Sequence, residues 1–212
     1  MRGILINNEI HTGRDLNLVM TGKSLPTPKP QTYTVEVPGR NGLLDLSEFI
    51  SGETTYNNRT LTFNFVGDGS RETVLNLIDA MCEYHGQNLI ITTDDYLDWY
   101  YSGRAEVDYT DHGYYVEFTL TVDAYPFRRA INPKVYTYGV CEDLIITVLN
   151  EGQSVIPTVT VTGEATIVKG YTSVTIEDGV YESEVFKLSK GENEFTITTN
   201  GTITITYREA VI

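Results

Sequence analysis

The sequence predicts a mainly β protein: an N-terminal β-rich domain with one α-helix packed on a sheet, followed by a C-terminal β-sandwich. The 15 tyrosines and 18 glycines favour strands and turns over helices. A helical period occurs once, at Arg71–His85, whereas strict alternation of apolar and polar residues is clearest over 114–123. Residues 131–212 show no helical period and contain short strands at regular spacing, which is typical of a sandwich.

The composition describes a folded protein with an acidic surface. Hydrophobic residues make up 41% of the 212 residues and charged residues 21%. The formal net charge is −14, with 10 basic and 18 acidic residues in 1–130 and 5 and 11 in 131–212. Neither half therefore has the basic charge of a nucleic-acid-binding surface. The acidity either serves solubility or forms a channel wall along which DNA slides without sticking.

No segment is predicted to enter a membrane. The chain lacks an apolar run of the roughly 18 residues that a membrane-spanning helix needs, and its start lacks a signal-peptide pattern. We therefore expect assembly in the cytoplasm, or exit from it by a route other than secretion. In that compartment Cys82 and Cys141, the two cysteines, are expected to be reduced packing residues and not a disulfide.

An extended arm is predicted at residues 22–34. Pro26, Pro28 and Pro30 stand at every second position, and proline cannot donate to a ladder in mid-sheet. Two interpretations stay open for this arm. It is either a surface connection or a stiff segment that lies on a neighbouring subunit, because a stiff segment loses little entropy on docking.

A tight turn is predicted after a strand at 34–37. Proline ends the strand, and glycine and asparagine tolerate positive φ. The turn residues are Pro38, Gly39, Arg40, Asn41 and Gly42. The apolar residues that follow are expected to return to the core: Leu43, Leu44, Leu46, Phe49 and Ile50.

The predicted helix, Arg71–His85, has Ser70 as its N-cap and Gly86 just beyond its end. Its apolar stripe is expected to pack on a sheet: Val74, Leu75, Leu77, Ile78, Met81 and Cys82. Asp111–Gly113 is a predicted hairpin loop with glycine in the left-handed region. Strands of the first domain are expected at residues 3–10, 16–20, 60–66, 89–93, 97–102, 104–110 and 114–123.

A domain boundary is expected where the alternation breaks at Ala124–Arg129. It divides the chain into domains 1–130 and 131–212. Strands of the second domain are expected at residues 144–149, 158–162, 165–168, 173–176, 184–188, 194–198 and 202–208. The last two are expected to form a hairpin joined at Asn200-Gly201.

No catalytic, cofactor or metal site is predicted, and we expect no enzyme. The histidines show no pairing at ligand spacing: His11, His85 and His112. An acidic cluster lacks the glycine and glutamate of an EF-hand and is expected to be a solvated turn: Asp94, Asp95 and Asp98. Trp99 and Tyr101 share a strand face and are expected in a core or subunit contact, in preference to a sugar site.

Two sets of motifs resemble siphophage distal tail proteins. The first is Val37–Asp45 (VPGRNGLLD), followed by the aromatic strand Tyr56–Phe65 and the single helix. The second comprises Asn150-Glu151-Gly152, Pro157 before a strand, Leu188–Asn193 and Tyr207–Glu209. With the order of elements between them, the resemblance covers nearly the whole chain.

This resemblance implies a structural component of the tail hub or baseplate. Residues 1–130 would form a homo-hexameric ring, with the arm as a belt onto the neighbour, and residues 131–212 a galectin-like sandwich outside it. The implied partners are further copies of the chain, the tail tube protein, the tail-associated tip protein and receptor-binding proteins, with DNA as passing cargo. The implied location is the virion tail, assembled in the host bacterial cytoplasm, with phage, prophage and tailocin left open.

Two alternatives remain beside the hub hypothesis. A carbohydrate-binding β-sandwich adhesin is the main one, although residues 131–212 contain no histidine or tryptophan of the kind that a galectin sugar site uses. A glycoside hydrolase is the other, and it would need two carboxylates across a cleft. In the hub hypothesis, the proline arm and the Pro38–Gly42 turn are the candidate oligomer interface.

Overall fold

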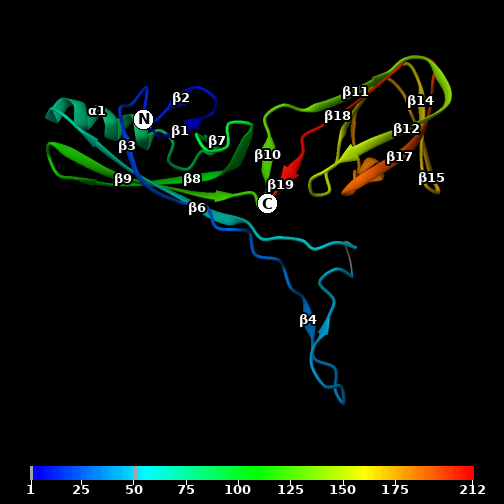
Figure 1. The fold of residues 1–212 in the computed structure, drawn as a ribbon, viewed down its shortest axis with the longest axis horizontal. Helices are drawn as coiled ribbons and strands as arrows, with labels where there is room; N and C mark the ends of the chain where they lie inside the picture. The colour runs from blue at the N-terminus through cyan, green and yellow to red at the C-terminus, as the bar shows by residue number, and fades with distance from the viewer. Residues whose placement is uncertain (1, 50–51) are drawn as a thin grey trace. The chain divides into compact units, whose positions relative to one another are not determined.

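The computed structural model describes residues 2–49 and 52–212 (Figure 1). The chain divides into two compact units, residues 1–128 with Ile212 and residues 129–211. Each unit has a hydrophobic core of its own. Strands dominate both units, and α1 (Arg71–Cys82) is the one α-helix among the described residues, which confirms the predicted mainly β fold.

An antiparallel sheet forms the body of the first unit, with strands in the order β2–β1–β7–β8–β9–β6–β3. Their bounds are β1 Ile4–Ile6, β2 Ile10–His11, β3 Val19–Ser24, β6 Arg59–Asp68, β7 Asn88–Thr93, β8 Trp99–Asp111 and β9 Tyr115–Ala124. The sequence predicted two strands where β8 runs unbroken. Gly103 lies at the expected break, and a Cβ there would meet the Asp123 carbonyl at 2.2 Å, so the glycine permits close approach of β9.

The predicted alternation in β9 is confirmed, because its apolar residues form the centre of the core: Val116, Phe118, Leu120 and Val122. They face buried residues of β6 across the ladder, such as Phe65 opposite Phe118. Gly113, in the β8–β9 loop, has φ +89° as predicted. The core side of the sheet is thus fixed by period-2 patterning in adjacent strands.

Helix α1 covers the core side of this sheet. Ser70 accepts a hydrogen bond from the Thr73 N–H at 3.2 Å, which confirms the predicted cap. The buried positions are Val74, Leu77, Ile78 and Met81. Leu75 is 44% exposed, so its predicted place in the buried stripe is wrong, because its position points away from the sheet. The helix ends at Cys82, one turn before the prediction, and Gly86 with φ +78° follows that turn.

The segment between β3 and β6 forms a hairpin arm, drawn as a ribbon of its own in Figure 1. β4 (Thr34–Val35) pairs with β5 (Leu44–Asp45) as a separate two-stranded sheet. Residues 22–24 belong to β3, so the extended part of the predicted arm starts at Leu25. Below, "the arm" means residues 25–58.

The expected return of apolar residues to the core after the turn is wrong. Leu43 is 60% exposed and Phe49 82%, and Ile50 lies outside the described residues. β4 and β5 pair with each other as a separate two-stranded sheet, and among residues 2–49 and 52–212 no further strand joins them to cover these side chains.

The second unit is a sandwich of two four-stranded antiparallel sheets, in the orders β11–β18–β13–β16 and β12–β17–β14–β15. Bounds are β11 Lys134–Tyr138, β12 Cys141–Asn150, β13 Thr158–Thr162, β14 Ala165–Lys169, β15 Thr172–Ile176, β16 Gly179–Glu182, β17 Gly191–Thr199 and β18 Thr202–Tyr207. Short strands β10 (Arg128–Ala130) and β19 (Ala210–Val211) pair with each other. One core cluster draws residues from both sheets, which confirms the predicted sandwich.

Two local expectations for this unit are wrong. β17 pairs with β12 and β14, whereas β18 pairs with β11 and β13, so Asn200-Gly201 links the two sheets and does not close a hairpin. Crossing lets the apolar sides of both strands face the same core from opposite layers. The predicted strand at 184–188 is instead a 3₁₀ turn, η1 (Glu184–Phe186), capped by Ser183.

Candidate assembly surfaces

The tip of the arm is a defined turn. The Arg40 N–H donates to the Val37 carbonyl at 3.1 Å, with Pro38 and Gly39 between them and Gly39 at φ +82°. Proline at the first central position and positive φ at the second describe a type II turn. Gly42 also has positive φ, at +78°. The predicted turn residues, 38–42, therefore form the tip, and all of them are exposed.

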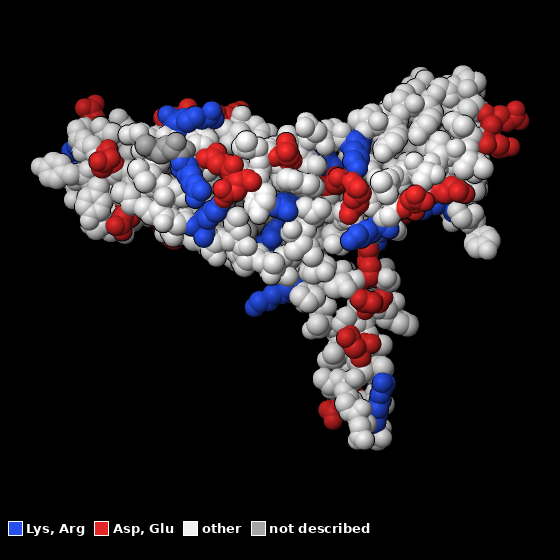
Figure 2. Space-filling view, in the orientation of Figure 1, with Lys and Arg blue, Asp and Glu red and all other residues white. Residues whose placement is uncertain are grey.

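Hydrogen bonds within the hairpin hold the body of the arm together. The Tyr33 N–H donates to Ser47 Oγ, and the Leu46 N–H donates to the Tyr33 carbonyl, both at 2.8 Å. No residue of 31–49 is buried, and Tyr33 is 64% exposed. Figure 2 shows acidic side chains along this hairpin, which carries Glu36 and Asp45. An isolated two-stranded hairpin is marginally stable in water.

The root of the arm is tied to the sheet unit. Its two strands meet at an antiparallel bridge between Pro30 and Tyr56. Tyr56 packs edge-on against Phe127, with ring centroids 5.4 Å apart. Of the three predicted prolines, Pro28 is buried and the other two are exposed. The structure thus places the prolines at the root and the glycine turn at the tip, at opposite ends of one arm.

The face of the sheet opposite α1 is polar. Along β6 and β9 the residues between the buried ones are polar or charged apart from Val66 and Tyr115, and they include four threonines. Thr62 pairs with Thr121 across the two strands. Thr119 donates its hydroxyl to Asn64 Oδ1 at 3.2 Å. The charged residues on this face of β6, β8 and β9 are acidic apart from Arg104: Asp68, Glu106, Asp108, Glu117 and Asp123.

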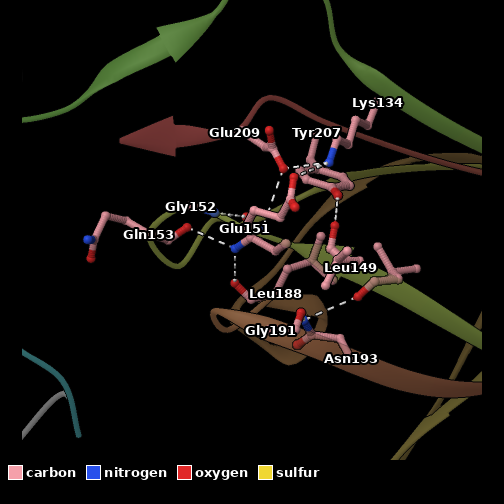
Figure 3. Close-up of polar contacts among 12 residues, drawn as sticks. Lys134, Leu149, Glu151, Gly152, Gln153, Leu188, Gly191, Asn193, Tyr207 and Glu209 are labelled. Carbon is pink, nitrogen blue, oxygen red and sulfur yellow. Dashed lines mark hydrogen bonds and ion pairs between the residues drawn. The ribbon is translucent and has the colours of Figure 1, made fainter. Parts of the chain in front are cut away.

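In the second unit, residues from three parts of the second motif set lie close together in Figure 3: Glu151 and Gly152, Leu188 to Asn193, and Tyr207 with Glu209. Asn150 is fully buried, and its Nδ2 donates to the carbonyls of Gln153 at 2.9 Å and Leu188 at 3.1 Å. Its Oδ1 accepts the Gly152 N–H at 3.2 Å. A Cβ on Gly152 would approach the Ala210 carbonyl oxygen to 2.4 Å, so the glycine allows the chain end to pack there.

Asn193 has the same role in a neighbouring loop. Its Nδ2 donates to the Ser189 and Gly191 carbonyls at 2.8 and 3.1 Å, and its Oδ1 accepts the Ser189 N–H at 2.9 Å. Each asparagine side chain therefore supplies hydrogen bonds to backbone groups of a loop that strand pairing alone would leave incomplete. These motif residues are structural: they shape loops and offer no reactive group.

An ion pair and a buried phenol complete this cluster (Figure 3). Lys134 Nζ lies 2.5 Å from Glu209 Oε1 and 3.6 Å from Glu151 Oε2, and the hydrogen bond to Glu209 raises the pKa of the lysine. The Tyr207 hydroxyl donates to the Leu149 carbonyl at 2.5 Å. Burial, followed by the neighbouring Tyr136, raises the pKa of Tyr207, which therefore stays a neutral donor.

One pair that sequence reasoning missed joins β2 to the end of β7. His11 is 5% exposed, and its Nε2 lies 3.1 Å from Asp94 Oδ1. Its Nδ1 accepts the N–H groups of Gly13 and Arg14, both at 3.1 Å, which places the ring proton on Nε2. Burial raises the pKa of Asp94, but hydrogen bonds from His11 and from the Gly3 N–H outweigh burial, so the pKa is lowered.

The His11–Asp94 pair does not belong to a group of metal ligands in the part of the chain that the structure describes. Within residues 2–49 and 52–212, no three histidine, cysteine or acidic residues are arranged to hold a metal ion. In the same ranges, no helix has the length and apolar character needed to cross a membrane. Trp99, which sequence reasoning considered for sugar stacking, is half-buried under the Arg128 guanidinium, whose carbon lies 5.5 Å from its ring centroid.

These features define a class by fold: a mainly β protein with a single-helix sheet unit, a sandwich and an exposed arm. No protein-family model and no curated protein matches the chain. Among solved structures it is similar to the Dit (gp 19.1) protein of phage SPP1, described as a paradigm of hub adsorption apparatus in phages that infect Gram-positive bacteria. The match has a TM-score of 0.66, covers 100% of both chains and has 15% identity. At that identity it establishes a shared fold, and it confirms the structural resemblance that the motifs predicted.

Proposed function

We propose that the chain is a distal tail, or hub, protein that forms a ring between the tail tube and the tail tip of a phage-like particle. The observation that carries this proposal is the exposed arm of a chain whose whole fold matches a phage hub protein. The partners would be further copies of the chain, most simply six, together with the tube protein, the tip protein and receptor-binding proteins. The place of action would be the virion tail, after assembly in the host cytoplasm.

In this proposal domain 1–130 forms the ring, and domain 131–212 is a sandwich outside it. The arm of one copy lies on the next, so that its apolar side chains become covered. Contacts of this head-to-tail kind close into a ring when the rotation allows. The Pro26–Pro30 root and the Pro38–Gly42 tip set the reach and direction of the arm.

The acidic face of the sheet would line the channel. Five carboxylates and one guanidinium, placed among threonines on β6, β8 and β9, repel phosphate and leave few basic groups to hold it. DNA would then pass as cargo without being bound. The work of the protein would be geometric and not enzymatic.

A mass measurement of the purified chain tests the ring. Six copies of a 23.8 kDa chain give a particle of about 143 kDa, which negative-stain imaging would show as a ring. We expect Phe49→Ser, on the arm, to shift the equilibrium toward monomer at least tenfold. Leu75→Ser removes an exposed leucine from α1 and serves as the matched control, with no effect on assembly.

Two outcomes would contradict the proposal. One is a 23.8 kDa monomer at every concentration that also forms no ring on purified tail tubes. The other is a sugar-dependent rise in melting temperature that Trp99→Ala abolishes, which would favour the adhesin alternative.

A further inference from the structure

Two arginines at the root of the arm lack an anionic partner. Arg59, the first residue of β6, is 6% exposed. Its Nη1 donates to the Pro26 carbonyl at 3.3 Å, but its Nε and Nη2 are buried without any hydrogen-bond partner. Its guanidinium carbon lies 5.0 Å from the ring centroid of Tyr101. The positively charged guanidinium of Arg59 is therefore buried in the unit with a single hydrogen bond, and that bond is long.

Arg128 is the second cation. Its guanidinium carbon lies 4.3 Å from the ring centroid of Tyr96 and 5.5 Å from that of Trp99, and its Nε is also buried without a partner. Within residues 2–49 and 52–212, the ion pairs include neither of these guanidiniums. Burial lowers the pKa of Arg59, the nearby Tyr101 raises it, and the charge of Arg128 lowers it further.

Such an arrangement is costly for an isolated chain. Buried charges in proteins are normally paired, and like charges close together oppose each other. The aromatic rings offset part of the cost through cation–π contacts. The rings do not supply a hydrogen-bond acceptor for the unpaired N–H groups of the two arginines. An anion with oxygen acceptors would satisfy these groups and offset the positive charge.

We propose that Arg59 and Arg128 form a carboxylate-binding site that receives an acidic side chain from a second copy of this chain. Guanidinium groups match carboxylates in shape and donate two parallel hydrogen bonds. Arg128 is half-buried, so the incoming group meets it first, and Arg59 supplies the second positive charge behind it. This inference rests on the proposed ring.

Charge complementarity identifies a second copy as the source. The chain has 29 acidic and 15 basic residues, so each copy offers carboxylates in excess over cations. Two neighbouring guanidiniums without a carboxylate partner complement that excess. Because Arg59 also contacts Pro26 of the arm, and Phe127 beside Arg128 contacts Tyr56, the site lies at the place where the arm leaves the sheet.

The experiment uses the full chain and sodium acetate as the carboxylate probe. Melting temperature is measured at a protein concentration below self-association, in acetate and in sodium chloride of equal ionic strength. Acetate should raise the melting temperature of the native chain and of Lys190→Gln, a control that removes one charge from an exposed turn. It should have no such effect on Arg128→Gln. Arg128→Lys, which keeps the charge but loses the fork, should show a reduced shift and guards against misfolding of the glutamine variant.

Self-association is then measured on the same variants. We expect Arg128→Gln to weaken it at least tenfold and Lys190→Gln to leave it unchanged. An equal acetate response in Arg128→Gln overturns the site. A lost acetate response with native self-association overturns the second copy as the source and assigns the carboxylate to another protein. Stabilisation by inorganic phosphate at a tenth of the acetate concentration would reassign the site to phosphate.

The two proposals can fail separately. If the native chain forms no ring, the proposed function fails, yet the acetate comparison still decides whether the arginine pair binds a carboxylate. If rings form normally in Arg128→Gln, the hub proposal stands and the carboxylate contact between copies does not.

Discussion

Replacing the arm separates its role in assembly from any role in folding. The bridge between Pro30 and Tyr56 holds the two ends of the hairpin side by side, as in an antiparallel ladder. Residues 31–55 can therefore be replaced by Asn-Gly, a pair that closes two-residue hairpin loops. We expect this variant to fold, to melt at or above the native temperature, and to stay monomeric.

The magnitude follows from burial and loop length. No residue of 31–49 or 52–55 is buried, so replacing these residues removes no core contact. The native loop is roughly twelve times longer than its replacement, and each doubling of loop length costs about 0.6 kcal/mol of closure entropy. The variant should therefore gain about 2 kcal/mol in unfolding free energy. For a chain of this size, 1 kcal/mol corresponds to about 2–4 °C in melting temperature.

The single tryptophan makes the assay specific to the first unit. Trp99 lies in β8, so its fluorescence during urea unfolding reports the sheet that carries the arm. Analytical ultracentrifugation measures association in parallel. A variant that replaces only the Pro38–Gly42 tip tells whether the tip or the hairpin body makes the contact. A melting temperature several degrees below native, or unchanged association in the full replacement, would refute this reasoning.

Two further predictions concern stability. Asn150→Ala removes three side-chain hydrogen bonds, two of them buried, and should lower the unfolding free energy of the sandwich by about 2–4 kcal/mol. Urea unfolding followed by circular dichroism measures this loss, and Thr147→Ala, on the exposed side of β12, should change the unfolding free energy little. Asp94, whose folded pKa lies below 3.8, should stabilise the fold above that pH and lose this effect as the pH falls through the folded pKa. The melting temperatures of the native chain and Asp94→Asn should therefore differ at neutral pH and converge in acid. A constant difference would contradict the role of the carboxylate.

Patterns within one element were readable from the sequence. The alternation of β9 and the capped period of α1 each fix which side is buried, because neighbouring positions in one strand or helix have set directions. The glycines of the arm tip were also readable, since positive φ is a local requirement. The motif set around Asn150 and Asn193 pointed to the sandwich only through the family resemblance. The structure gives the physical reason for the motif, because both asparagine side chains hydrogen-bond to loop backbone groups.

Contacts between distant segments were not readable. His11 and Asp94 meet, as do Arg59 and Tyr101, only because the sheet order brings their strands together. The arm was misjudged for a related reason. An apolar run such as Leu43–Phe49 has the same sequence pattern whether it is buried within its own chain or exposed for contact with another chain. A single sequence does not distinguish these two cases.

The crossing at Asn200-Gly201 sets the order in which the sandwich is completed. β18 comes last of the eight sandwich strands but lies between β11 and β13 in its sheet. Until the ribosome has released β18, β11 and β13 each have an unpaired edge, and their sheet has a gap between them. This unit should therefore close late and slowly, by long-range pairing, with a transient tendency to aggregate that a chaperone would suppress.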